Sequence, residues 1–75
     1  MKYNKVFQDT FNVSESELGA LRLKESEGWD SVGHIALIST LEEIFDVNFE
    51  PDDMFALSSY QDGLNILKEI YNIQF

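Results

Sequence analysis

The stretch Gly28-Trp29-Asp30-Ser31-Val32-Gly33-His34 runs directly into the longest amphipathic segment of the chain, Ile35-Ala36-Leu37-Ile38-Ser39-Thr40-Leu41-Glu42-Glu43-Ile44-Phe45. A turn glycine and an aspartate that can cap a helix stand just before Ser31. We therefore expect a helix from about Asp30 or Ser31 to Phe45, with the Ser31 hydroxyl in its first turn. Free backbone N–H groups and the positive end of the helix dipole favour an anion such as phosphate at that place.

Length and composition limit the chain to one small domain. Its 75 residues, 44% of them hydrophobic, allow a single core, so we expect one domain over residues 1–75. The sequence has no cysteine, which excludes disulfides and thiolate metal ligands. It also lacks a segment typical of a membrane span or a signal peptide. We therefore predict a cytoplasmic protein that is monomeric and does not insert into a membrane.

The charge balance is strongly acidic. Fourteen acidic residues against five basic ones give a formal net charge of −9, and residues 25–67 contain no lysine or arginine. Such a surface repels nucleic acid and attracts basic patches on other proteins. We expect no nucleic-acid partner, although the charge alone could simply confer solubility.

Hydrophobic spacing predicts an all-α fold, a small four-helix bundle. Three of its helices are main helices, and the helix that comes third along the chain is short. Tyr3, Val6, Phe7 and Phe11 are spaced as on one face of a helix that Asn12-Val13 ends. A capping box formed by Ser14 and Glu17 then predicts a short helical turn. Three leucines should hold the loop over residues 19–29 on the core, namely Leu18, Leu21 and Leu23.

The second half of the chain is predicted to hold the short helix and the last helix. The short helix should run from Asp52 to about Ala56 after Pro51, and contribute Met54, Phe55 and Leu57 to the core. The last helix should span residues 60–72 after a cap at Ser59, with Gly63 at a close helix contact.

The long helix should bury one arc and expose another. Its buried arc comprises Leu37, Ile38, Leu41, Ile44 and Phe45, with His34 near the N-terminal end. Val32 and Ile35 point away from that arc, which indicates a contact surface. Gly33 should leave open space beside Ser31, and Trp29 should pack against the helix start.

Taken alone, Ser31 has several interpretations. A serine next to an aspartate at a helix start is typical of a capping residue. A nucleophilic serine would need a base, and the only histidine, His34, falls on the buried arc, so no catalytic residue is predicted. The acidic run that starts at Asp46 departs from a calcium loop at Pro51 and Leu57, so no metal site is predicted either.

The run Trp29-Asp30-Ser31-Val32-Gly33-His34, followed by Leu41-Glu42-Glu43-Ile44-Phe45, resembles the acyl and peptidyl carrier proteins, in which Asp30-Ser31-Val32 corresponds to an Asp-Ser-Leu signature. The resemblance continues through Asp46-Val47-Asn48-Phe49 and Leu57-Ser58-Ser59-Tyr60-Gln61-Asp62. It implies that Ser31, with Asp30 as the flanking motif residue, accepts 4′-phosphopantetheine from coenzyme A. A separate magnesium-dependent phosphopantetheinyl transferase would add the group.

The resemblance also implies a carrier that is not itself an enzyme. The thiol of the group would hold acyl or aminoacyl cargo as a thioester between partner enzymes with basic surface patches. The positions that match the family's partner contacts are Val32, Ile35, Glu42 and Glu43. Gly33 and Ala36 stand where many fatty-acid carriers have acidic residues, which favours a free-standing carrier of a specialised biosynthetic pathway. The alternative is an acidic helical interaction module without a prosthetic group.

Overall fold

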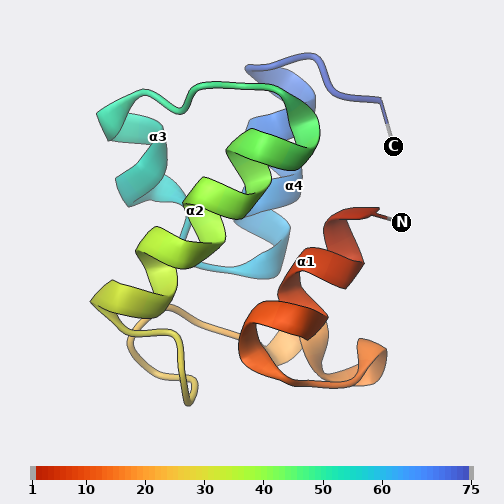
Figure 1. The fold of residues 1–75 in the computed structure, drawn as a ribbon, viewed down its shortest axis with the longest axis vertical. Helices are drawn as coiled ribbons and strands as arrows, with labels where there is room; N and C mark the ends of the chain where they lie inside the picture. Colours follow the sequence, from red (N-terminus) through yellow and green to blue (C-terminus); the bar gives the residue numbers. More distant parts are fainter. Residues whose placement is uncertain (1, 75) are drawn as a thin grey trace.

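The computed structural model of the chain describes residues 2–74. Its elements are α1 (Lys2–Phe11), the 3-10 helix η1 (Glu15–Ala20), α2 (Ser31–Phe45), α3 (Pro51–Ala56) and α4 (Tyr60–Glu69). In Figure 1, α2 runs diagonally across the front of α4, with α1 on one side and α3 on the other. The described residues form no strand beyond an isolated bridge between Arg22 and Ser59, so the all-α prediction is confirmed. Nor is any helix among them long and apolar enough to cross a bilayer.

The first two α-helices end in the same way. Asn12 and Asp46 adopt left-handed backbone angles, with φ of 53° and 54°. The next amide then donates back to a carbonyl five residues earlier, from Val13 to Gln8 (3.3 Å) and from Val47 to Glu42 (3.1 Å). This is the Schellman type of helix end, which asparagine and aspartate tolerate at the left-handed position. The predicted ends of both helices are confirmed.

The connection from α1 to α2 is long but anchored. The Glu17 carboxylate accepts hydrogen bonds from the hydroxyl (2.8 Å) and the amide (3.1 Å) of Ser14, which lower the pKa of Glu17. Further along, the Leu23 amide donates to the carbonyl of Ser58 (2.9 Å) and the Lys24 amide to that of Trp29 (2.7 Å). The leucines expected to hold this loop on the core are buried or partly buried; they are Leu18, Leu21 and Leu23.

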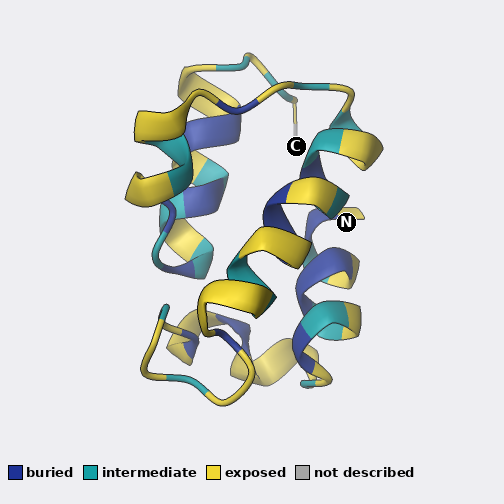
Figure 2. Ribbon diagram, turned by 60° about the vertical axis from the view of Figure 1, so that its left-hand side comes forward, coloured by how far each residue is buried: buried dark blue, intermediate teal, exposed yellow. Residues whose placement is uncertain are grey.

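The core is rich in aromatic side chains from α1 and includes Trp29, which lies just before α2. Trp29 is fully buried, stacks on Phe11 at 5.0 Å between ring centroids and meets the Phe7 ring edge-on at 5.6 Å. The buried side of α2 comprises Leu37, Ile38 and Leu41, as its periodicity predicts. Figure 2 shows the buried residues of the main helices facing one another and the exposed ones facing outward.

Two predicted core residues are exposed. Phe55, expected in the core, has 80% of its surface exposed, and Ile44 has 42%. In α3, the half-buried Met54 and the buried Leu57 that follows the helix lie on the inner side. Since each residue turns a helix by about 100°, Phe55 is directed away from that side. The core predictions for Phe55 and for Ile44 are therefore wrong.

The last helix is shorter than its periodicity predicts. α4 ends at Glu69 and not at residue 72, because Asn72 turns the chain with a φ of 58°. The Ile73 amide then donates to the carbonyl of Leu67 (2.9 Å), and the Tyr71 hydroxyl reaches the start of α3. Tyr71 fits the helical spacing of the preceding residues because it packs against the core, although it lies after the end of α4.

Gly63 lies at a close contact between α4 and α1, as predicted. A Cβ atom at this position would lie 2.1 Å from the Tyr3 hydroxyl oxygen. That hydroxyl donates to the Tyr60 carbonyl (2.6 Å), and burial raises the pKa of Tyr3 above the ordinary tyrosine range.

We expect Gly63→Ala to lower the free energy of unfolding by about 1–3 kcal/mol, because overpacking outweighs the higher helix propensity of alanine. Urea denaturation measures the loss. Gly19→Ala is the matched control, since no atom lies within 4 Å of a Cβ there, and its change should stay within about 0.5 kcal/mol. In a Tyr3→Phe background the cost of Gly63→Ala should shrink; an unchanged cost would rule out the hydroxyl as its cause.

Candidate functional site

The start of α2 is capped by Asp30. This residue has an extended backbone (φ −98°, ψ −167°), and its Oδ1 atom accepts a hydrogen bond from the Gly33 amide at 2.9 Å. An aspartate in this position satisfies one of the free N–H groups of the first turn and complements the helix dipole. The structure thus gives the capping role to Asp30, and Ser31 is the first residue of the helix.

Ser31 is exposed and its hydroxyl is not engaged. Within residues 2–74 this hydroxyl forms no hydrogen bond. The backbone N–H groups of Ser31 and Val32 precede the first hydrogen bond of the helix, which runs from the His34 amide to the Asp30 carbonyl (2.8 Å). A phosphate carried on the Ser31 oxygen therefore fits this helix end, because the first-turn amides and the helix dipole favour an anion.

Gly33 has a different role from the one expected. A Cβ atom at this position would lie 2.0 Å from the Gly28 carbonyl oxygen, so the turn before α2 occupies the space that the missing side chain leaves. Gly28 itself has a φ of 83°, a left-handed conformation that suits glycine. The expected open space beside Ser31 is thus not found at Gly33. This glycine allows residues 28–30 to fold closely over the first turn of α2.

His34 is hydrogen-bonded at both ring nitrogens. Trp29 donates from Nε1 to His34 Nδ1 (3.0 Å), and His34 Nε2 lies 2.7 Å from the backbone carbonyl oxygen of Met54 in α3. The rings of Trp29 and His34 are nearly parallel, at 22°. Neither nitrogen is free to take the proton of Ser31, so this arrangement does not supply the base that a serine nucleophile requires.

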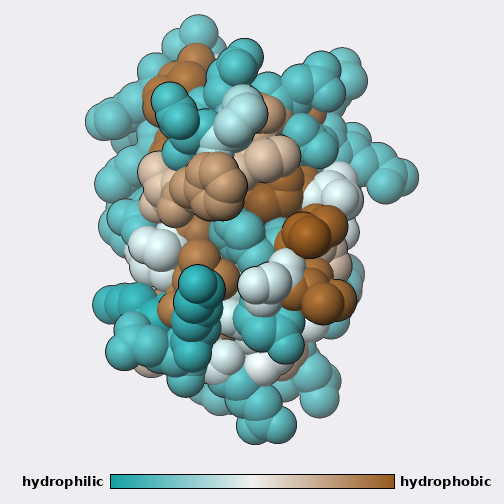
Figure 3. Space-filling model, turned by 90° about the vertical axis from the view of Figure 1, so that its left-hand side faces the viewer, coloured by the Kyte–Doolittle hydropathy of each residue, from teal (hydrophilic) through white to brown (hydrophobic). Residues whose placement is uncertain are grey.

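Three large hydrophobic side chains near Ser31 are exposed. Val32 is 77% exposed, Ile35 66% and Phe55 80%, and we call them the apolar patch. The hydrogen bond between His34 and Met54 joins α2 to α3. Ile35 follows His34 in α2, and Phe55 follows Met54 in α3. Figure 3 shows this side of the molecule, where hydrophobic side chains form a band between hydrophilic areas. Sequence reasoning found Val32 and Ile35 but missed Phe55, whose only signal was its position beside Met54 in a short helix.

The two glutamates predicted to contact partners differ in their surroundings. Glu43 is exposed, whereas Glu42 is half-buried and its Oε2 atom accepts a hydrogen bond from the Phe49 amide (2.8 Å). Glu42 therefore holds the connection between α2 and α3, a role that the sequence did not indicate. Both residues lie about 17 Å along the helix axis from Ser31, at the far end of α2.

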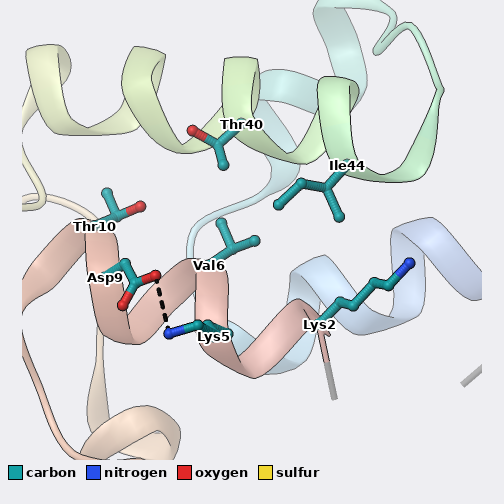
Figure 4. Close-up of a pocket in the computed structure, with 7 residues that line it drawn as sticks. All are labelled: Lys2, Lys5, Val6, Asp9, Thr10, Thr40 and Ile44. Atoms are coloured by element: carbon teal, nitrogen blue, oxygen red, sulfur yellow. Dashed lines mark ion pairs between the residues drawn. The ribbon is translucent and has the colours of Figure 1, made fainter.

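A groove lies between α1 and α2, away from Ser31. Its volume is about 550 Å³, and it includes Val6, Thr40 and the partly exposed Ile44. Figure 4 shows Val6 directed toward α2 between Thr40 and Ile44, and the ion pair of Lys5 with Asp9 (3.4 Å) along α1. Thr40 is about 13 Å along the helix axis from Ser31, so the groove does not form part of the Ser31 site.

No arrangement of metal ligands accompanies the site. Among the residues that the structure describes, no group of His, Cys, Asp and Glu side chains could hold a metal ion. The acidic run after α2 is instead committed to the fold, with Asp46 ending α2 and Asp53 accepting a hydrogen bond from the Tyr71 hydroxyl (2.7 Å).

The chain matches no protein-family model, no curated protein and no solved structure. A functional assignment therefore has to be argued from the geometry of Ser31 and from the motif around it.

The division of roles between Asp30 and Ser31 is directly testable. We expect Asp30→Ala to lower the free energy of unfolding by about 0.5–2 kcal/mol, because the Gly33 amide loses its partner. Ser31→Ala should change the same quantity by less than about 0.5 kcal/mol, because the hydroxyl makes no hydrogen bond. Thermal and urea denaturation of both variants measure the difference. A larger loss in Ser31→Ala would mean that serine caps the helix.

Proposed function

We propose that the protein is a free-standing acyl or aminoacyl carrier protein whose Ser31 carries 4′-phosphopantetheine. The observation that carries this proposal is the Ser31 hydroxyl, which is exposed at the first residue of α2 and is not needed for capping. The resemblance of Trp29-Asp30-Ser31-Val32-Gly33-His34 to the carrier signature supports the same assignment. The all-α fold, with its order of helices, and the net charge of −9 agree with it.

The modification needs only an accessible oxygen from this chain. The Ser31 oxygen would form a bond to the phosphorus next to the pantetheine of coenzyme A, while the pyrophosphate bond breaks and adenosine 3′,5′-bisphosphate leaves. The hydroxyl proton would pass to a base of the transferase, since both nitrogens of His34 are hydrogen-bonded elsewhere. Once attached, the group supplies a thiol that can hold acyl cargo as a thioester.

The surroundings of Ser31 suit recognition by other proteins. The apolar patch offers Val32, Ile35 and Phe55 to solvent beside the attachment point. Exposed carboxylates accompany it, from Asp30 before α2 and Asp52 in α3. An exposed apolar patch with an acidic rim favours enzymes whose own surface is apolar and basic around the active-site entrance. A carrier of a specialised biosynthetic pathway would present the same surface to its transferase and to the enzymes that load and unload it.

Incubation of the purified protein with coenzyme A, magnesium and a broad-specificity phosphopantetheinyl transferase tests the proposal. Intact-protein mass spectrometry should show one added phosphopantetheine, which fragmentation places on Ser31. Ser31→Ala should gain none, and Ser39→Ala, which removes another exposed hydroxyl of α2, should be modified like the wild type. An unmodified wild type, or equal modification of Ser31→Ala, would refute the assignment.

A second candidate function is a binding module without a prosthetic group, and the exposure of the apolar patch favours it. In that case Ser31→Ala should leave the binding of a partner intact, whereas Ile35→Asp should weaken it at least tenfold. Titration calorimetry of the unmodified variants against an isolated partner measures both affinities. Partner binding that requires the modified Ser31 would exclude this alternative.

A further inference from the structure

The hydrogen bonds of His34 define a single form of its ring. An indole N–H can only donate and a backbone carbonyl can only accept. Because Trp29 Nε1 faces Nδ1 and the Met54 oxygen faces Nε2, the ring must be neutral, with its proton on Nε2. We call this arrangement the Trp29–His34–Met54 bridge.

The bridge joins the aromatic core to α2 and α3, the two helices that carry the exposed surface around Ser31. Trp29 is fully buried in the aromatic core, His34 belongs to the first turns of α2, and Met54 belongs to α3. α3 itself has six residues, none of them buried. Within residues 2–74, the side chains that form hydrogen bonds to α3 or its cap residue are Tyr71, near its start, and His34, near its end. The end of α3 that bears Phe55 is therefore held by the hydrogen bond to His34 together with the buried Leu57 that follows the helix.

We propose that His34 is a positioning residue that holds α3, and with it Phe55, against the Ser31 end of α2, and that it does so only as the neutral Nε2–H tautomer. The inference rests on the proposed function to the extent that the apolar patch is the surface that partner enzymes contact. His34 needs no contact with Ser31 for this role. It acts through the Met54 carbonyl.

Only the neutral Nε2–H form of the ring makes both hydrogen bonds of the bridge. A proton on Nδ1 faces the Trp29 N–H, so two donors meet and the hydrogen bond is lost. The charged side chains of the loop before α2 and of α3 are those of Arg22, Lys24, Glu25, Glu27, Asp30, Asp52 and Asp53, and the charged residues of α2 itself, Glu42 and Glu43, lie at its far end. Among the described residues, none of them forms an ion pair with His34, and the Asp53 carboxylate accepts from Tyr71.

Nuclear magnetic resonance can observe this bridge without any substitution, because the chain contains one histidine and one tryptophan. At pH 8 the nitrogen shifts of the unmodified protein should identify the Nε2–H tautomer. In His34→Ala the Trp29 indole N–H and the amides of α3 should shift together, whereas in His34→Gln, whose amide can accept from the indole and donate to the Met54 carbonyl, they should stay close to the wild type. An Nδ1–H tautomer, or a folded His34→Ala variant in which the amides of α3 keep their wild-type shifts, would overturn the proposal.

Substitutions test the consequence for partner recognition. We expect His34→Ala and Phe55→Ala each to raise the KM of the transferase for the carrier by about three- to tenfold, with kcat little changed. His34→Gln retains a neutral N–H donor that can reach the Met54 carbonyl, and should restore most of the loss.

The outcomes separate this inference from the proposed function. If no transferase modifies the wild type, the carrier assignment fails, while the tautomer and the coupled shifts of α3 remain measurable. If the wild type is modified but His34→Ala, shown to be folded by circular dichroism, has an unchanged KM, the positioning role is wrong. Should His34→Ala fail to fold, His34→Leu, which fills more of the space but has no N–H for the Met54 carbonyl, takes its place, and a wild-type KM in that variant would overturn the proposal.

Discussion

The burial of Trp29 is the constraint on which the position of Ser31 depends. The indole is fully buried, lies against Phe7 and Phe11 of α1, and is only two residues from the serine. Its backbone amide and carbonyl are also hydrogen-bonded, to Ser26 (3.1 Å) and Lys24 (2.7 Å). Burial of so large a side chain contributes about 3–5 kcal/mol, a large share of the stability of a small domain. The exposed hydroxyl therefore stands on one of the most firmly held points of the fold.

The main helices could be predicted because their side chains repeat. α2 begins at Ser31 and ends at Phe45, as its spacing and its aspartate cap indicate, and Leu37 and Leu41 lie on the expected buried side. Periodicity failed where a residue packs on the core without being helical. Tyr71 fits the helical spacing of α4, yet its hydroxyl accepts from the Glu50 amide after the helix has ended. A hydrophobic pattern records which side chains face inward, and it does not record the backbone that carries them.

The candidate site was predictable in part, for a similar reason. The exposure of Val32 and Ile35 followed from the phase of a long helix, and the role of Asp30 from its residue type. The surroundings of Gly33, Glu42 and His34 depend on contacts with other segments: the Gly28 carbonyl, the Phe49 amide and the Met54 carbonyl. Such contacts form only after the helices have packed.

The construction of α3 has a consequence for how the sequence can vary. This helix buries no residue, and the bonds that fasten it at its two ends involve a tyrosine hydroxyl and a backbone carbonyl. Its outward positions, among them Phe55 and Asp52, can therefore be exchanged without disturbing core packing. Natural selection or protein engineering can alter the surface beside Ser31 at little cost in stability, so descendants of one sequence could diverge in the proteins they contact while the fold stays the same.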